Sequence, residues 1–100
     1  MITNENKEYY PIGTVVLLEN AKKRIMIIGY KAKTMDKNDA KSQEIIWDYS
    51  GCIYPEGLLS SDQILLFNHS QIKDIYYSGF QDEEFKGLKE KLKKIDFANE

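Results

Sequence analysis

The stretch from Ile45 to Gly57 constrains the fold of this chain more than any other part of its sequence. It contains the only Trp and the only Cys, begins with a β-branched and aromatic run, and ends in Tyr54-Pro55-Glu56-Gly57. A run of that composition predicts a strand, and Pro followed closely by Gly predicts a turn. The chain has 100 residues, which indicates one domain built around this strand and turn.

Two apolar runs precede this stretch and predict an antiparallel pair of strands. Residues 14–18 and 24–30 are rich in Val, Ile and Leu and are joined by a short polar segment, which is typical of a hairpin. Because both runs are continuously apolar, we expect strands covered on both faces or placed in a strongly curved sheet. Residues 31–41 are polar without a clear period and predict a mobile loop.

The second half of the chain predicts two further short strands and a helix. Residues 63–67 are too few for periodicity to separate strand from helix, and a strand is favoured there; residues 73–78 also favour a strand. Asp82 is a suitable N-cap for a helix whose apolar positions recur at steps of three and four. These positions are Phe85, Leu88, Leu92 and Ile95.

Together these patterns predict an α+β fold: a small curved antiparallel sheet of about four to five strands, SH3-like or a partly open barrel, followed by a C-terminal amphipathic helix. We expect a disordered N-terminus at 1–8, a mainly β region at 9–80 with the loop at 31–41, and a helix of the same domain at 81–97.

Charge and cysteine content exclude several classes of function. The net charge is −2 and the pI is about 5.4, which argues against a general nucleic-acid binder because such proteins carry a basic patch. A single Cys cannot form an internal disulfide, so a reducing compartment is expected. There is neither a signal-peptide pattern nor an apolar run of about 20 residues. We therefore expect a cytoplasmic protein that does not bind a membrane.

The residues that could carry catalysis are few. Cys52 and His69 are the only Cys and the only His, and a dyad between them, oriented by Asp48 or Asp74, is the one nucleophilic arrangement that the composition permits. A structural role is favoured for both, Cys52 as a small buried side chain and His69 within a capped turn. Two such ligands cannot make a zinc site. We expect no catalytic residues, no metal and no cofactor.

Two surface features favour protein binding instead. The helix stripe is expected mainly to dock on the chain's own sheet. Seven Tyr residues exceed what so small an interior can hold with satisfied hydroxyls, so some are expected to face a partner. The candidate protein-binding residues are Tyr54, Glu56, Tyr76, Tyr77, Phe85 and Leu88.

Three blocks of the sequence resemble a known family. The runs 11–18 and 26–30 resemble its opening, residues 47–57 resemble its central signature DY-x-G-x-x-YPEG, and Leu66-Phe67-Asn68-His69 with the apolar positions Ile72 and Ile75 resembles its third block. This is domain-of-unknown-function family 4176 of Gram-positive bacteria. The resemblance extends from about Tyr10 to Glu84, and the central block is its specific part.

Members of that family are typically encoded in type VII secretion loci, near LXG-type toxins and small helical partner proteins. The resemblance implies a cytoplasmic accessory or adaptor protein, a targeting chaperone that holds a toxin or its helical partner before export. It implies no enzymatic activity. Two alternatives stay open: an immunity protein that inhibits the toxin, and a small enzyme that uses Cys52 and His69. The expected partner is a protein, with a homodimer also left open.

Overall fold

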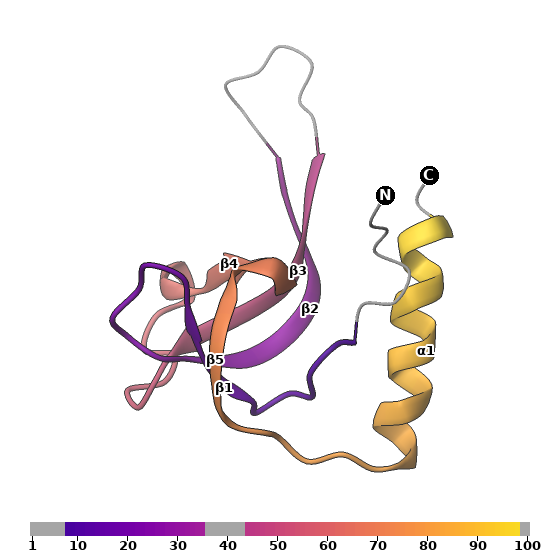
Figure 1. Cartoon of the computed structure of the whole chain (residues 1–100). Helices are drawn as coiled ribbons and strands as arrows, with labels where there is room; N and C mark the ends of the chain where they lie inside the picture. Colours follow the sequence, from indigo (N-terminus) through magenta and orange to yellow (C-terminus); the bar gives the residue numbers. More distant parts are fainter. Residues whose placement is uncertain (1–7, 36–43, 99–100) are drawn as a thin grey trace.

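A computed structural model describes residues 8–35 and 44–98 of the chain. Within these residues the sheet has five strands, all paired antiparallel, in the order β4-β3-β2-β1-β5, and a C-terminal helix stands beside it (Figure 1). This confirms the predicted α+β class, and the sheet is open with β4 and β5 at its edges. The element bounds are β1 (Val15–Leu18), β2 (Ile25–Met35), β3 (Glu44–Ile53), β4 (Leu65–Phe67), β5 (Ile72–Tyr77) and α1 (Glu83–Ala98), with 3₁₀ turns at Ser61–Gln63 and His69–Gln71.

The central signature forms the end of β3 and the turn after it. β2 and β3 pair from Ile25 opposite Ile53 to Met35 opposite Glu44. The predicted loop at 31–41 is therefore wrong at its start, because residues 31–35 continue β2. Their polar composition does not predict a strand, but their backbone pairs with β3. Strand pairing therefore overrides local propensity here. Residues 36–43, and residues 1–7 of the predicted disordered terminus, lie outside the described residues.

The ambiguous segment 63–67 divides between two structures. Gln63 ends a 3₁₀ turn, and Leu65–Phe67 forms the edge strand β4 opposite Tyr49, Ser50 and Gly51. Gly51 is required at this crossing, since an added Cβ would lie 2.6 Å from Ile25 Cγ2 and 2.7 Å from the Met26 carbonyl oxygen. The absence of a side chain at Gly51 thus allows the neighbouring strand to pack closely against β3.

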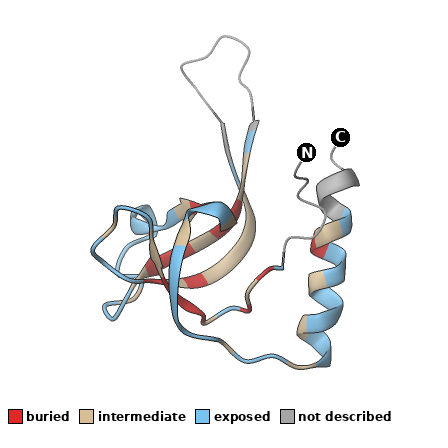
Figure 2. Cartoon of the chain, in the orientation of Figure 1, coloured by how far each residue is buried: buried red, intermediate tan, exposed pale blue. Residues whose placement is uncertain are grey.

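The buried core lies where the sheet, the N-terminal segment and one position of α1 meet (Figure 2). Its buried members are Tyr9, Val16, Ile25, Ile27, Tyr49, Phe67 and Leu92. The N-terminal segment runs between the sheet and α1 (Figure 1), so the helix reaches the core chiefly through that segment.

The helix begins as the sequence predicts. Phe85 N–H donates to Asp82 Oδ1 at 3.0 Å, which confirms Asp82 as the N-cap, and the helix spans Glu83–Ala98 where 81–97 is predicted. Its apolar stripe is only partly covered: Leu92 is 4% exposed, whereas Leu88 is 37% exposed. The side chain of Ile95 lies outside the described part of the helix.

Candidate functional site

Four of the seven tyrosine side chains lie in or against the core, and three are exposed. Tyr9 and Tyr49 are almost fully buried, and Tyr10 and Tyr30 are half-buried around them. The Tyr9 and Tyr49 ring centroids lie 5.8 Å apart at an interplanar angle of 65°, an edge-to-face packing that favours aromatic pairs. These four rings therefore serve the core, and they leave three tyrosines for the surface.

The inward hydroxyls find partners within this cluster. Tyr30 Oη donates to the Tyr10 carbonyl oxygen, and Tyr49 Oη accepts from Tyr10 N–H at 3.1 Å. Burial raises the pKa of Tyr30 to about 12 and raises the pKa values of Tyr9 and Tyr49 as well. Burial disfavours the phenolate, so these hydroxyls keep their protons to a higher pH than an exposed tyrosine does.

His69 is held in a structural network. Its Nδ1 lies 2.8 Å from Tyr49 Oη, and its ring stacks on Tyr10 with centroids 5.0 Å apart. Its backbone N–H donates to Asp48 Oδ2 at 2.8 Å, while Asp48 N–H donates to Asn68 Oδ1 at 3.1 Å. These bonds join β3 to the capped turn after β4. Asp48 and Tyr49 of the central signature therefore hold that turn against the sheet.

Cys52 is placed away from this network. It is a buried free thiol in β3, opposite Met26 in β2. Side chains alternate between the faces of a strand, so Cys52, three residues after Tyr49, points to the other face of the sheet from the tyrosine that binds His69. The structure thus separates the two residues of the hypothetical dyad.

The β5 surface, which we define as Ile75, Tyr76 and Tyr77, is an exposed apolar feature of the sheet. β5 pairs only with β1, so its other edge is unpaired within the described sheet. The three side chains are 46%, 52% and 64% exposed. Three large apolar side chains in succession on an edge strand are unusual for a solvated surface and typical of a binding site.

Arg24 connects the other candidate residues to this surface. Its guanidinium lies 4.4 Å from the centre of the Tyr76 ring, and its carbonyl accepts from Tyr54 N–H at 2.9 Å. Tyr54 is 40% exposed, and Glu56 forms an ion pair with Lys23 at 2.9 Å. A hydrogen bond from Lys23 lowers the pKa of Glu56. The turn and β5 therefore lie at the same end of the sheet.

Phe85 and Leu88 lie in a separate place, an apolar groove beside α1. The groove has a volume of about 330 Å³ and is lined by Ile12, Tyr30, Phe80, Glu84, Phe85 and Leu88. The sequence therefore names two of its residues and misses Ile12 and Phe80. Phe80 is 79% exposed and lies in the connection between β5 and α1. It is the one large apolar residue in that polar connection, and this sequence signal could have identified it.

Within the described residues, no cluster of three or more His, Cys, Asp or Glu side chains could hold a metal ion. No helix in the described ranges is both long enough and apolar enough to cross a membrane.

One family matches most of this chain. The family model described as "Domain of unknown function (DUF4176)" matches residues 9–88. The chain belongs to the DUF4176 family. No curated protein and no solved structure matches this DUF4176 chain, and an SH3-like relationship of its sheet stays a prediction.

Proposed function

We propose that this DUF4176 protein is a cytoplasmic accessory protein of type VII secretion. In this proposal it binds an LXG-type toxin, or the toxin's small helical partner, and holds it as an adaptor or targeting chaperone before export. It transforms no substrate. The observation that supports a binding role is the β5 surface. Its three large apolar side chains are exposed to solvent, and such exposed apolar patches often mark binding sites.

The β5 surface suits a polypeptide client for two physical reasons. Tyr76 and Tyr77 offer large rigid rings that bury much area with little loss of side-chain entropy, which is why Tyr is enriched among residues that dominate binding energy. The edge of β5 that is unpaired within the described sheet and the Tyr side chains of β5 together form a face against which a client helix could pack. The Arg24 guanidinium holds the Tyr76 ring in place, so part of the surface is already ordered.

The test is co-expression of the full chain with an LXG-type toxin from the same locus, followed by gel filtration and titration calorimetry. Tyr77→Ala should weaken the complex about tenfold or more, as truncation of an anchoring aromatic does. Leu59→Ala is the matched control, because Leu59 is 73% exposed and lies in the connection between β3 and β4. Separate elution of the two wild-type proteins at micromolar concentration would refute the proposal.

The same experiment separates the alternatives when the toxin is divided into its two parts. A targeting chaperone binds the N-terminal export domain, whereas an immunity protein binds the C-terminal toxic domain. For the enzyme alternative, Cys52→Ala should leave toxin export by the cells unchanged. Loss of export by a Cys52→Ala variant that still folds would support the enzyme.

A further inference from the structure

One side of α1 carries two charged side chains and one apolar side chain that the described part of the chain leaves exposed. Glu84, Leu88 and Lys91 follow each other at steps of four and three, so they lie along the same side of the helix. Glu84 and Leu88 line the apolar groove. Leu88 is 37% exposed, in contrast to Leu92 one turn later, which is 4% exposed. The first half of the helix therefore presents an incompletely buried side.

The two charges on this side have no partner within the described residues, whereas other charges of α1 do. Lys89 and Lys93 bind Glu8 at 3.0 and 3.1 Å, and Glu83 pairs with Lys86 at 3.7 Å. Glu84 and Lys91 are separated by seven residues, about 10 Å along the helix, which is too far for a direct ion pair between them. Each therefore remains available to a charge on another molecule.

We propose that this side of α1 binds a second copy of the same chain, with the two helices antiparallel about a two-fold axis beside Leu88. The antiparallel arrangement places Leu88 against Leu88 of the second copy. It places Glu84 opposite Lys91 of the second copy, and by symmetry Lys91 opposite its Glu84. The order acid, apolar, base along the helix is thus self-complementary, which is what a two-fold interface requires.

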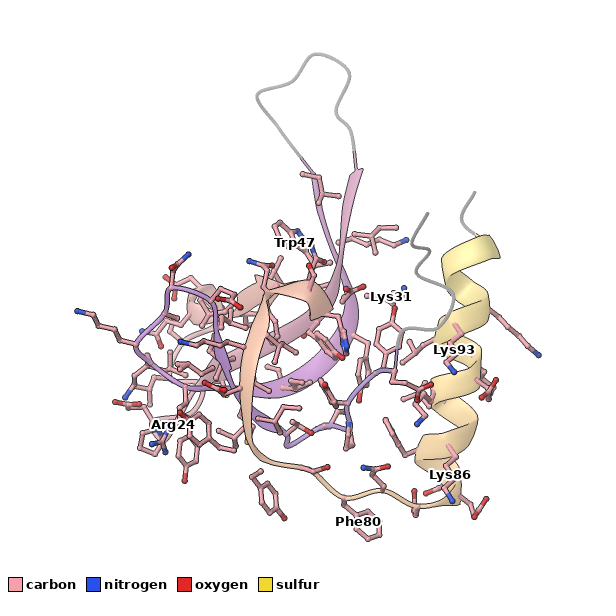
Figure 3. The ribbon with its side chains drawn as sticks, viewed as in Figure 1. Arg24, Lys31, Trp47, Phe80, Lys86 and Lys93 are labelled. Carbon is pink, nitrogen blue, oxygen red and sulfur yellow. The ribbon has the colours of Figure 1, made fainter. Side chains whose placement is uncertain are left out.

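The groove supplies the remaining contact area. Phe80 projects from the connection between β5 and α1 (Figure 3) and is 79% exposed. Ile12, which also lines the groove, is 54% exposed. The second helix would cover both side chains. We expect this interface to be small and the dimer to have micromolar affinity.

This inference does not depend on the proposed client, because it rests on residues of α1 and of the groove beside it. Arg24, which marks the β5 surface, lies at the end of the sheet away from α1 (Figure 3). A dimer through α1 therefore leaves Tyr76 accessible.

The experiment is sedimentation equilibrium of the full chain from about 1 to about 300 μM, a range that brackets a micromolar dissociation constant. The wild type should pass from monomer to dimer. Leu88→Asp should remain a monomer, since it puts two carboxylates at the symmetry axis, and Leu59→Asp, at an exposed site away from α1, should dimerise like the wild type. A wild-type monomer at every concentration, or a dimer unaffected by Leu88→Asp, overturns the proposal.

A charge exchange tests the antiparallel geometry. Glu84→Lys and Lys91→Glu should each weaken the dimer about tenfold, because each creates two like-charge contacts. The double variant should recover the wild-type dissociation constant, since every copy then carries both exchanged charges. A double variant weaker than either single variant overturns the proposed arrangement.

Discussion

The burial of Tyr49 and the exposure of Tyr76 and Tyr77 follow the hydrogen-bond partners available to their hydroxyls. Tyr49 is fully buried because Tyr10 N–H and His69 Nδ1 both reach its oxygen. Tyr76 and Tyr77 sit on an edge strand, where their hydroxyls can reach water. The aromatic excess is therefore one structural cluster and one candidate binding surface.

The buried hydroxyls predict a loss of stability in alkali. Tyr30 has a pKa of about 12 in the folded chain against an ordinary value of 10, and burial raises the pKa values of Tyr9 and Tyr49 too. Below pH 10 both states bind these protons, so the free energy of unfolding is insensitive to these groups there. Above pH 10 the unfolded state releases them first, so stability should fall from about pH 10 to about pH 12.

Urea unfolding as a function of pH, with tyrosinate absorbance as the probe, measures this effect. Tyr30→Phe should lose less stability across the interval, because it has no phenol to ionise at that position. An equal decline in both proteins would contradict the role of Tyr30.

Two glycines predict opposite responses to Ala. Gly51→Ala should lower the free energy of unfolding by about 1–3 kcal/mol, because the new methyl meets Ile25 and the Met26 carbonyl. Gly87→Ala, on the exposed side of α1 with open space around it, should raise that free energy by about 0.5–1 kcal/mol through helix propensity. Chemical denaturation of the two variants checks the pair, and a stabilising Gly51→Ala would contradict the close crossing of the strands.

At the scale of elements, α1 is held by few contacts and the sheet by many. The helix has one fully buried side chain among those described, Leu92, whereas the strands share a continuous backbone ladder from β4 to β5. Gly79 fixes the connection between β5 and α1 against the N-terminal segment. Its N–H donates to Thr14 Oγ1 at 3.1 Å, and a Cβ there would collide with the Ile12 carbonyl. The connection from β5 is thereby pinned to the N-terminal segment that also contacts α1.

The ion pairs of Glu8 predict that acid loosens this helix. Hydrogen bonds from Lys89 and Lys93 lower the pKa of Glu8 below its ordinary value of 4.5. The contribution to stability is thus present above pH 4.5 and is lost as pH falls through the lowered pKa of the folded chain. Glu8→Gln should remove it at neutral pH and weaken docking of α1 by about 0.2–1 kcal/mol, since the pairs are exposed.

Hydrogen exchange of the α1 amides measures that docking. Faster exchange in Glu8→Gln than in Glu19→Gln is expected, because Glu19 is exposed and has no ion pair within the described residues. Equal rates in the two variants would show that the ion pairs do not hold the helix.

For the molecule as a whole, Arg24 and Tyr76 lie away from α1 (Figure 3), and this predicts a stoichiometry. If the β5 surface binds the client and α1 binds a second copy, the purified complex should contain two copies of each. Light scattering above the dissociation constant of the dimer should give that mass, and Leu88→Asp should reduce it to one copy of each without loss of the client. A one-to-one mass for the wild type would show that the client and the second copy compete.

The sequence by itself determined the local features: strands at β-branched runs, a turn at the end of the central signature, and a helix capped by Asp82. These follow from propensity and spacing within a few residues. Only the tertiary structure decided that residues 31–35 form a strand, which tyrosines are buried, and that Leu88 stays exposed while Leu92 is covered. Those outcomes depend on which distant segments meet, and strand pairing and core packing set them through contacts that no local pattern records.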